Sequence, residues 1–320
     1  MTQAENPLWF VIDSTKAKDY LECPRKFWWR HILGWEQEGA NINLIFGEAF
    51  HKIMEQLLID GYSVEAVEAG MTAFNQVYRQ HYPAETDQER APKNAVFAEL
   101  AAIDYIKNYS NDLARYEVLH TEVSGSVAIV PSDGDRRLTK LYFKMDSILR
   151  DSALDAIVSF EHKTTGQSFT QRYGNQWPLS FQIGTYTHVM RSFYPPEQVW
   201  GVIVNSISLL KTKTAFMRYP VRKTAPQMQV WLNIADEVLW NIEQDLDSYL
   251  AETDDPDLTM HSFPLNPTSC DRWFGCPYLD FCVAWENPIT RISSYETPPP
   301  NFKTSYWDPR AVETREKVEL

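Results

Sequence analysis

The sequence predicts an α/β fold in which a mixed central sheet is flanked by helices. Three observations support this class. Apolar residues recur at helical spacing from Phe50 to Leu58. Short runs rich in Val, Ile, Phe and Leu follow and are typical of a strand meander. Helical and strand textures then alternate once more before a long amphipathic helix, which favours one sheet with helices around it.

The elements expected in chain order begin with a capped helix. Asp13 and Ser14 precede the helical run Thr15–Leu21 as N-cap residues would. Further helices are expected after Gly47 and near 63–81, 94–115, 177–193 and 225–251. Strands are expected over 117–130, 138–150, 154–163, 199–209 and 214–221. The remainder, from Ala251, is expected to be loop-like.

Nothing marks a clean boundary within most of the chain. We therefore expect one domain over residues 1–290, with a helical insertion at about 48–115 and a cysteine-bearing segment at about 265–285. The run of three prolines from Pro298 lies in the last part, residues 291–320, which is expected to be an extended tail.

Composition places the protein among folded, cytoplasmic chains. Of its 320 residues, 44% are hydrophobic and 13% aromatic, which argues against disorder. Met1–Phe10 lacks the pattern of a signal peptide, and no run of 18 apolar residues occurs, so no membrane association is expected.

The net charge of −13 argues mildly against a nucleic-acid partner, but phosphate binding needs only a local basic patch. Two basic clusters interleaved with aromatic residues are candidates for such a patch, and the alternative is that both are ordinary solvated faces. The candidate DNA-binding residues are Lys16, Arg25, Lys26, Arg30, Lys211 and Lys213.

The most informative segment carries two carboxylates and a lysine. Asp146 lies in one expected strand, and Glu161 and Lys163 lie in the next. Side chains alternate along a strand, so Glu161 and Lys163 share a face while His162 points away, and a hairpin could bring Asp146 opposite them. Such a group suits magnesium-assisted phosphodiester hydrolysis, with the backbone carbonyl of His162 as a further ligand. The alternative for an isolated Glu-x-Lys is a surface ion pair, but the apolar flanks indicate a strand that is at least half buried.

Other candidates reinforce this site. His51, on the helix that follows Gly47, is the candidate for a fourth metal contact; the alternative is a structural role, which is more common for a lone helical histidine. Gln182 and Tyr186 stand one helical turn apart; taken alone, a polar residue at Gln182 would be an ordinary surface residue.

Four cysteines suggest one metal centre held by thiolates. Cys270, Cys276 and Cys282 are evenly spaced near the end of the chain, and Cys23 stands alone near the start. Disulfides are not expected in a cytoplasmic protein. A three-plus-one pattern favours a [4Fe–4S] cluster over a structural zinc site, which usually shows closer cysteine pairs. Zinc and unpaired thiols remain alternatives.

Taken together, these segments resemble the RecB-type branch of the PD-(D/E)xK nuclease superfamily, and specifically its iron–sulfur members: CRISPR-adaptation exonucleases, the AddB nuclease domain and phage-encoded relatives. The similarity rests on an ordered set of motifs across residues 14–282. These are the entry segment from Ser14 to Phe27 with Cys23, Gly47–His51, Asp146, Glu161-His162-Lys163, Gln182 with Tyr186, and the three late cysteines.

The resemblance implies a restriction-endonuclease-like core and a Mg²⁺- or Mn²⁺-dependent deoxyribonuclease. It assigns metal binding to His51, Asp146, Glu161 and the His162 carbonyl, catalysis also to Lys163, Gln182 and Tyr186, and cluster ligation to the four cysteines. It also implies an exonuclease acting on single-stranded ends or unwound DNA in processing, repair or recombination. The chain has no P-loop motor motif, so it would act alone or be fed by a helicase or recombination partner. The alternative is a non-catalytic nucleic-acid-binding or assembly subunit stapled by the same cluster.

Overall fold

A computed structural model describes residues 5–129, 136–255, 258–271, 275–292, 298–312 and 314–320. The chain separates into two compact units, each assembled from segments that are distant in sequence. The first unit contains residues 1–39, 126–143 and 225–312, and the second contains residues 40–125, 144–224 and 313–320. The prediction of one domain over 1–290 stays a prediction.

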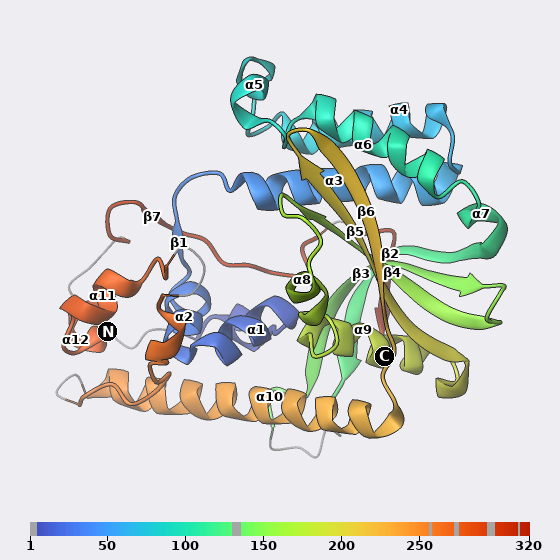
Figure 1. The fold of residues 1–320 in the computed structure, drawn as a ribbon. Helices are drawn as coiled ribbons and strands as arrows, with labels where there is room; N and C mark the ends of the chain where they lie inside the picture. Colours follow the sequence, from blue (N-terminus) through green and yellow to red (C-terminus); the bar gives the residue numbers. More distant parts are fainter. Residues whose placement is uncertain (1–4, 130–135, 256–257, 272–274, 293–297, 313) are drawn as a thin grey trace. The chain divides into compact units, whose positions relative to one another are not determined.

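A six-stranded mixed sheet, most of whose residues belong to the second unit, has the strand order β6-β5-β4-β3-β2-β8 (Figure 1). Its strands are β2 (Tyr116–Ala128), β3 (Lys140–Asp151), β4 (Ala156–Thr165), β5 (Val199–Leu210), β6 (Lys213–Val221) and β8 (Glu316–Glu319). The β4–β5 pair is parallel, whereas β3–β4 and β5–β6 are antiparallel. The predicted α/β class with a mixed sheet flanked by helices is confirmed.

Three long helices cover one face of this sheet. They are α3 (Ile42–Asp60), α4 (Val64–Tyr78) and α6 (Ala95–Asn108). Two shorter helices, α5 (Asp87–Arg90) and α7 (Asp112–Arg115), precede and follow α6 in the chain. The apolar faces of the three long helices form one core that also contains Ile207 and Leu209 of β5. A Cβ added at Gly70 of α4 would lie 2.9 Å from the Cα of Ile53 in α3, so only glycine permits this close helix contact.

The connection between the parallel strands β4 and β5 supplies the remaining helices of the second unit. These are α8 (Gln171–Asn175) and α9 (Phe181–Phe193), and α9 packs against β5. The middle of β4, Ile157–His162, and ten of the twelve residues of β5 are buried, as expected for strands covered on both faces. Glu161 therefore lies inside the protein, whereas Lys163 stands at the end of β4 that is partly exposed.

The first unit is built around aromatic residues and one long helix. Its elements are α1 (Ser14–Glu22), α2 (Pro24–Phe27), the π-helical turn η2 (Trp28–Ile32), α10 (Ala225–Asp254), α11 (Leu279–Ala284) and α12 (Pro288–Ile292). Asp13 caps α1 as predicted, since its side chain accepts a hydrogen bond from the backbone N–H of Lys16. The Tyr20 hydroxyl donates to Asp245 of α10 at 2.6 Å.

The segments expected to be loop-like or extended contain further short elements. In the first unit, β1 (Trp35–Gln37) pairs with β7 (Phe302–Thr304), and β8 of the tail joins the sheet of the second unit. The 3₁₀ turns are η1 (Pro7–Phe10), η3 (Ala84–Thr86), η4 (Pro196–Gln198) and η5 (Pro267–Ser269).

Among the described residues, no helix combines the length and apolar character that a membrane span requires.

Candidate active site

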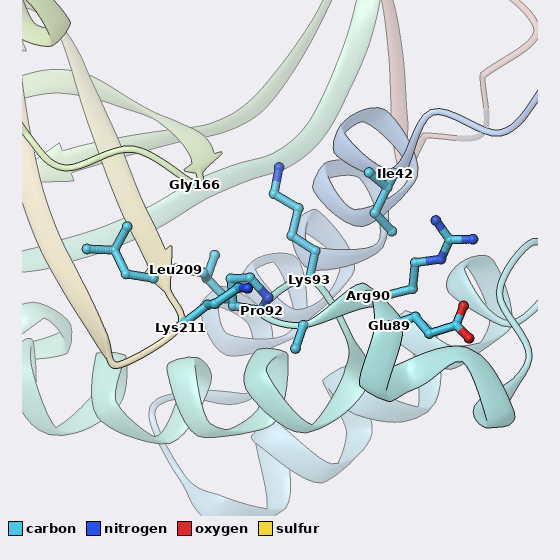
Figure 2. A pocket seen from close by; sticks show the side chains of 10 residues that line it. Ile42, Glu89, Arg90, Pro92, Lys93, Gly166, Leu209 and Lys211 are labelled. Carbon is cyan, nitrogen blue, oxygen red and sulfur yellow. The ribbon is translucent and has the colours of Figure 1, made fainter.

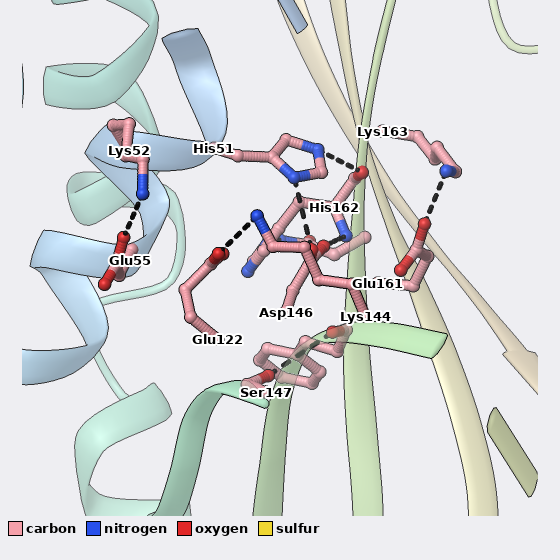
Figure 3. Close-up of polar contacts among 12 residues, drawn as sticks. His51, Lys52, Glu55, Glu122, Lys144, Asp146, Ser147, Glu161, His162 and Lys163 are labelled. Carbon is pink, nitrogen blue, oxygen red and sulfur yellow. Dashed lines mark hydrogen bonds and ion pairs between the residues drawn. The ribbon is translucent and has the colours of Figure 1, made fainter. Parts of the chain in front are cut away.

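The predicted catalytic residues meet in the second unit, where α3 passes β3 and β4 (Figure 3). Backbone pairing joins β3 and β4 from Leu149 opposite Val158 to Asp151 opposite Ala156. Further along, side chains connect them: Ser147 Oγ donates to the Phe160 carbonyl at 3.3 Å, and Asp146 Oδ2 accepts from the backbone N–H of His162 at 2.7 Å. The Asp146 carboxylate, which β3 carries, is thereby held against the backbone of β4.

His51 bridges two of the groups predicted to bind metal. Its Nε2 lies 2.8 Å from the carbonyl oxygen of His162, and its Nδ1 lies 3.2 Å from Oδ1 of Asp146. Burial lowers the pKa of His51, but the neighbouring Asp146 carboxylate outweighs this and raises it. Conversely, burial raises the pKa of Asp146, but His51 and the His162 N–H hold it well below its usual range.

Glu161 and Lys163 share a face of β4, as strand alternation predicts, and form an ion pair. Glu161 is only 1% exposed, and its Oε2 has no hydrogen-bond partner in the described part of the chain. Burial raises the pKa of Glu161, and the negative charge of Asp146 raises it further. Burial lowers the pKa of Lys163, but the Glu161 carboxylate raises it overall, so the ammonium stays charged.

The His162 side chain points to the other side of β4, into a buried polar network. Asn205 donates to Nδ1 of His162 at 2.9 Å and to the Tyr105 hydroxyl at 2.8 Å. Burial lowers the pKa of His162 to about 3, so the ring is neutral. Arg218 donates to Asn205, and its guanidinium forms an ion pair with Asp112. This network fixes the backbone of the residue whose carbonyl is a predicted ligand.

Gln182 and Tyr186, on α9, contact each other and the backbone next to Asp146. Gln182 Nε2 donates to the Tyr186 hydroxyl at 2.8 Å, and that hydroxyl donates to the carbonyl of Lys144. Tyr186 thus holds the strand two residues before Asp146. The contacts are those of positioning residues.

Sequence reasoning missed Glu122, a third carboxylate near the site. It is 2% exposed, lies in β2, and its Oε2 is 2.5 Å from Nζ of Lys144. Burial raises its pKa, and the nearby Asp146 carboxylate raises it further. Its backbone φ of 49° is unusual for a non-glycine residue. The sequence around it reads as an ordinary strand, so no local signal identifies it.

The oxygen-rich donor set around Asp146 fits a hard divalent cation. Carboxylate and carbonyl oxygens are the ligands that Mg²⁺ and Mn²⁺ prefer, and the unpaired, buried Oε2 of Glu161 is an oxygen that such an ion would satisfy. Within the described residues, no three His, Cys, Asp or Glu side chains stand close enough to enclose one ion as placed. Lys163 and His51 instead neutralise the carboxylates.

The four cysteines all belong to the first unit and are free thiols. Cys23 Sγ accepts from the backbone N–H of Asn266 at 3.4 Å, and Cys282 Sγ accepts from Trp29 Nε1 at 3.4 Å. Burial raises the pKa of Cys282, and the neighbouring sulfurs of Cys276 and Cys23 add to this effect. The thiols are close enough to influence one another's charge, although no three of them in the described part of the chain are placed to hold one metal ion. Residues 272–274, between two of the cysteines, lie outside the described residues.

Four of the predicted DNA-binding cations have internal partners in the first unit. Lys16 is 2% exposed and donates to the Leu8 carbonyl, and Arg25 is 6% exposed and donates to the Phe263 carbonyl. Lys26 and Arg30 form ion pairs with Asp19 at 2.9 and 3.0 Å. By contrast, the other two candidates, Lys211 and Lys213, are exposed at the β5–β6 turn of the second unit. A role in DNA binding stays a prediction for all six.

Comparison with known proteins identifies the family. The sequence profile of the PD-(D/E)XK nuclease superfamily matches residues 14–283, most of the chain. The chain belongs to this superfamily. The match encloses Asp146, Glu161 and Lys163, whose order follows the Asp…(Asp/Glu)-x-Lys pattern that names the superfamily, and membership indicates a nuclease.

Other comparisons add little. No curated protein is significantly similar to the chain. Among solved structures, the chain is similar to one described as "Crystal structure of SSO0001", with 13% identity, a TM-score of 0.31 and coverage of 74% of this chain and 78% of that one. Similarity at this level carries no functional argument.

Proposed function

We propose that the protein is a metal-dependent deoxyribonuclease with its active site at His51, Asp146, Glu161 and Lys163. The observation that carries this proposal is a group of two buried carboxylates and two partly exposed side chains, in which Lys163 pairs with Glu161 while His51 contacts both Asp146 and the His162 carbonyl. In a member of a nuclease superfamily, four such groups at one point between α3, β3 and β4 suit phosphodiester hydrolysis.

Asp146, Glu161, His51 and the carbonyl of His162 would hold Mg²⁺ or Mn²⁺. When bound, the ion polarises a phosphoryl oxygen and lowers the pKa of a water ligand. The other residues prepare this site. Asp146 is held in place by the His162 N–H, and the polar network behind β4 fixes the His162 backbone.

Lys163 is the residue proposed to act on the reacting atoms. Its charged ammonium stands beside Glu161, where it can orient the attacking water and offset charge that develops on the phosphoryl group. Tyr186 and Gln182 position the Asp146 strand through the Lys144 carbonyl. Glu122 pairs with Lys144 and so contacts the same stretch of β3.

The substrate proposed is DNA with single-stranded ends, cleaved exonucleolytically in DNA processing, repair or recombination. This follows the resemblance to the RecB-type branch, in which a separate helicase or recombination partner would supply unwound DNA. The four cysteines are proposed to hold a [4Fe–4S] cluster, with zinc as the alternative metal. Arg25 lies near Cys23 and Cys282, and its positive charge would offset that of the thiolates.

A non-catalytic binding or assembly subunit is the competing proposal. The net charge of −13 favours it, because a strongly acidic protein is repelled by DNA unless a basic partner intervenes. The complete set of His51, Asp146, Glu161 and Lys163 favours catalysis.

A cleavage assay distinguishes the two. Purified protein is incubated with single-stranded and duplex DNA, labelled at either the 5′ or the 3′ end, with Mg²⁺, Mn²⁺ or EDTA. We expect metal-dependent loss of single strands and no activity in EDTA. Release of the label as mononucleotides from one end would indicate an exonuclease and give its polarity. Stable binding without cleavage under every metal condition would support the non-catalytic subunit.

A further inference from the structure

A pocket of the second unit lies at the end of the strand that carries Glu161 and Lys163 (Figure 2). Its volume is about 390 Å³, within the range of small-ligand sites. It is lined by Ile42, residues 89–93, Gly166 and residues 209–211. None of these residues contributes to the catalytic group described above.

Contacts between α3 and β4 connect the catalytic group to this pocket. Nε2 of His51 lies 2.8 Å from the His162 carbonyl oxygen. One turn earlier in α3, Gly47 lies next to Thr164 of β4, since a Cβ added at Gly47 would be 3.6 Å from Oγ1 of Thr164. Beyond the end of β4, a Cβ on Gly166 would lie 3.9 Å from Cε of Lys93. At about 3.3 Å per extended residue, Gly166 is roughly 10 Å along the chain from Lys163. A DNA strand covers this distance with a few phosphates.

The pocket is cationic although the chain is acidic. Arg90, Lys93 and Lys211 line it, against the single acid Glu89 among its lining residues. Arg90 is exposed and lies over the Tyr82 ring at 5.1 Å, which orients its guanidinium. Lys93 is half-buried and donates to the side chain of Asn43.

A helix N-terminus adds to this positive potential independently of the side chains. Ile42, which lines the pocket, is the first residue of the 19-residue helix α3. The start of a helix carries a partial positive charge from the aligned peptide dipoles, which favours anions even though Asn41 caps the N–H groups of Asn43, Leu44 and Ile45 here. Three cations, a helix start and a cavity of nucleotide size therefore coincide.

We propose that this pocket binds a phosphate of single-stranded DNA a few nucleotides from the bond that is cut. The inference rests on the proposed nuclease function and adds a substrate-holding site to it. Arg90 and Lys211 contact the phosphate oxygens, whereas Lys93 holds Asn43 at the start of α3 and contributes its charge. A strand held here runs along β4 and α3 to the catalytic group, so longer substrates gain affinity that a dinucleotide lacks.

The test compares Arg90→Ala/Lys211→Ala with a matched control. Lys107→Ala removes an exposed lysine of α6 that does not line the pocket. Binding of a fluorescent oligodeoxythymidylate is measured in EDTA over a range of salt concentrations. We expect the double variant to bind roughly tenfold more weakly at low salt and its log–log salt slope to fall by about 1.4, which is 0.7 for each lost contact. Lys107→Ala should keep the wild-type slope. An unchanged melting temperature in each variant checks the fold.

A second measurement separates this inference from the nuclease proposal. Hydrolysis of thymidine 5′-(p-nitrophenyl phosphate) requires only the catalytic group, so the double variant should match the wild type on this substrate while its KM for the oligonucleotide rises. Affinity and salt slope equal to those of Lys107→Ala would overturn the pocket assignment, even if the wild type cleaves DNA. If the double variant binds DNA more weakly but the wild type cleaves nothing, the pocket assignment stands and the nuclease proposal is rejected.

Discussion

The ion pair between Arg218 and Asp112 offers a direct test of the packing behind the site. Arg218 is 17% exposed and Asp112 is 10% exposed at their side chains, and Arg218 also covers the rings of Tyr109 and Phe160 at 3.7 and 4.6 Å. Replacing Arg218 by Met keeps most of the volume but leaves the Asp112 carboxylate buried without its cation. Breaking a buried pair in this way costs about 3–5 kcal/mol.

The consequence should be visible in melting and denaturant experiments. For a folding unit of 150–250 residues, about 4 kcal/mol corresponds to a fall in Tm of roughly 10 °C. Arg222→Met, at an exposed arginine one residue beyond β6, is the matched control and should change Tm by little. Adding Asp112→Asn to Arg218→Met should restore part of the loss, because it removes the uncompensated charge. A loss below about 1 kcal/mol, or no restoration in the double variant, would refute this view of the network.

Three further predictions concern the catalytic lysine, the cysteines and Asp19, the aspartate of the first unit that pairs with Lys26 and Arg30. Lys163→Ala should leave the fold intact and cut the cleavage rate on the order of a hundredfold or more, as measured against Lys107→Ala, because it removes a charge contact to the transition state. Protein purified without oxygen should be brown and contain iron and sulfide, and Cys23→Ser should lower both Tm and activity, since a cluster shared by Cys23 and Cys270 closes a very long loop worth roughly 5 kcal/mol on the chain-entropy model. Asp19→Asn should destabilise the protein most near neutral pH and progressively less below about pH 4, the ordinary value for an unfolded Asp.

Each of these has an outcome that would contradict it. An unchanged rate in Lys163→Ala would remove that residue from the mechanism. Stoichiometric zinc without iron would reject the cluster and leave a four-cysteine metal site. The Asp19 prediction follows from its pKa: burial raises it, but His31, Arg30 and Lys26 hold it well below its usual range. A carboxylate of this kind stabilises the fold above its unfolded pKa, and the contribution is lost as the pH falls through the lower folded value. A destabilisation by Asp19→Asn that is equal at pH 3 and pH 7 would contradict it.

Most of the fold follows from local sequence patterns. The strands predicted over 154–163 and 199–209 are β4 (Ala156–Thr165) and β5 (Val199–Leu210), because continuous apolar runs of this length are typical of strands buried on both faces. The helix predicted from Gly47 begins five residues earlier, at Ile42, where the side chain of Asn41 caps it. Asn-x-Asn is a weak start signal, and the apolar spacing only becomes regular further along.

The polar surroundings of the site could be predicted less well. Alternation along β4 indicates that Glu161 and Lys163 share a face, which the structure bears out. The side chain of the neighbouring His162 contacts Asn205 of β5, which also donates to Tyr105 of α6, and the approach of Glu122 depends on a positive φ in β2. Such contacts are set by tertiary packing between residues far apart in sequence, and no local pattern encodes them.

Calorimetric titration with Mn²⁺ tests the central claim most directly, because it asks whether Asp146 and Glu161 bind the catalytic metal. Asp146→Asn and Glu161→Gln each remove one anionic oxygen ligand and keep the side-chain shape, and Asp104→Asn, at an exposed aspartate of α6, is the matched control. We expect the control to bind Mn²⁺ like the wild type and both site variants to bind it at least tenfold more weakly. Wild-type affinity in Asp146→Asn and Glu161→Gln would show that these carboxylates are structural and would contradict the proposed active site.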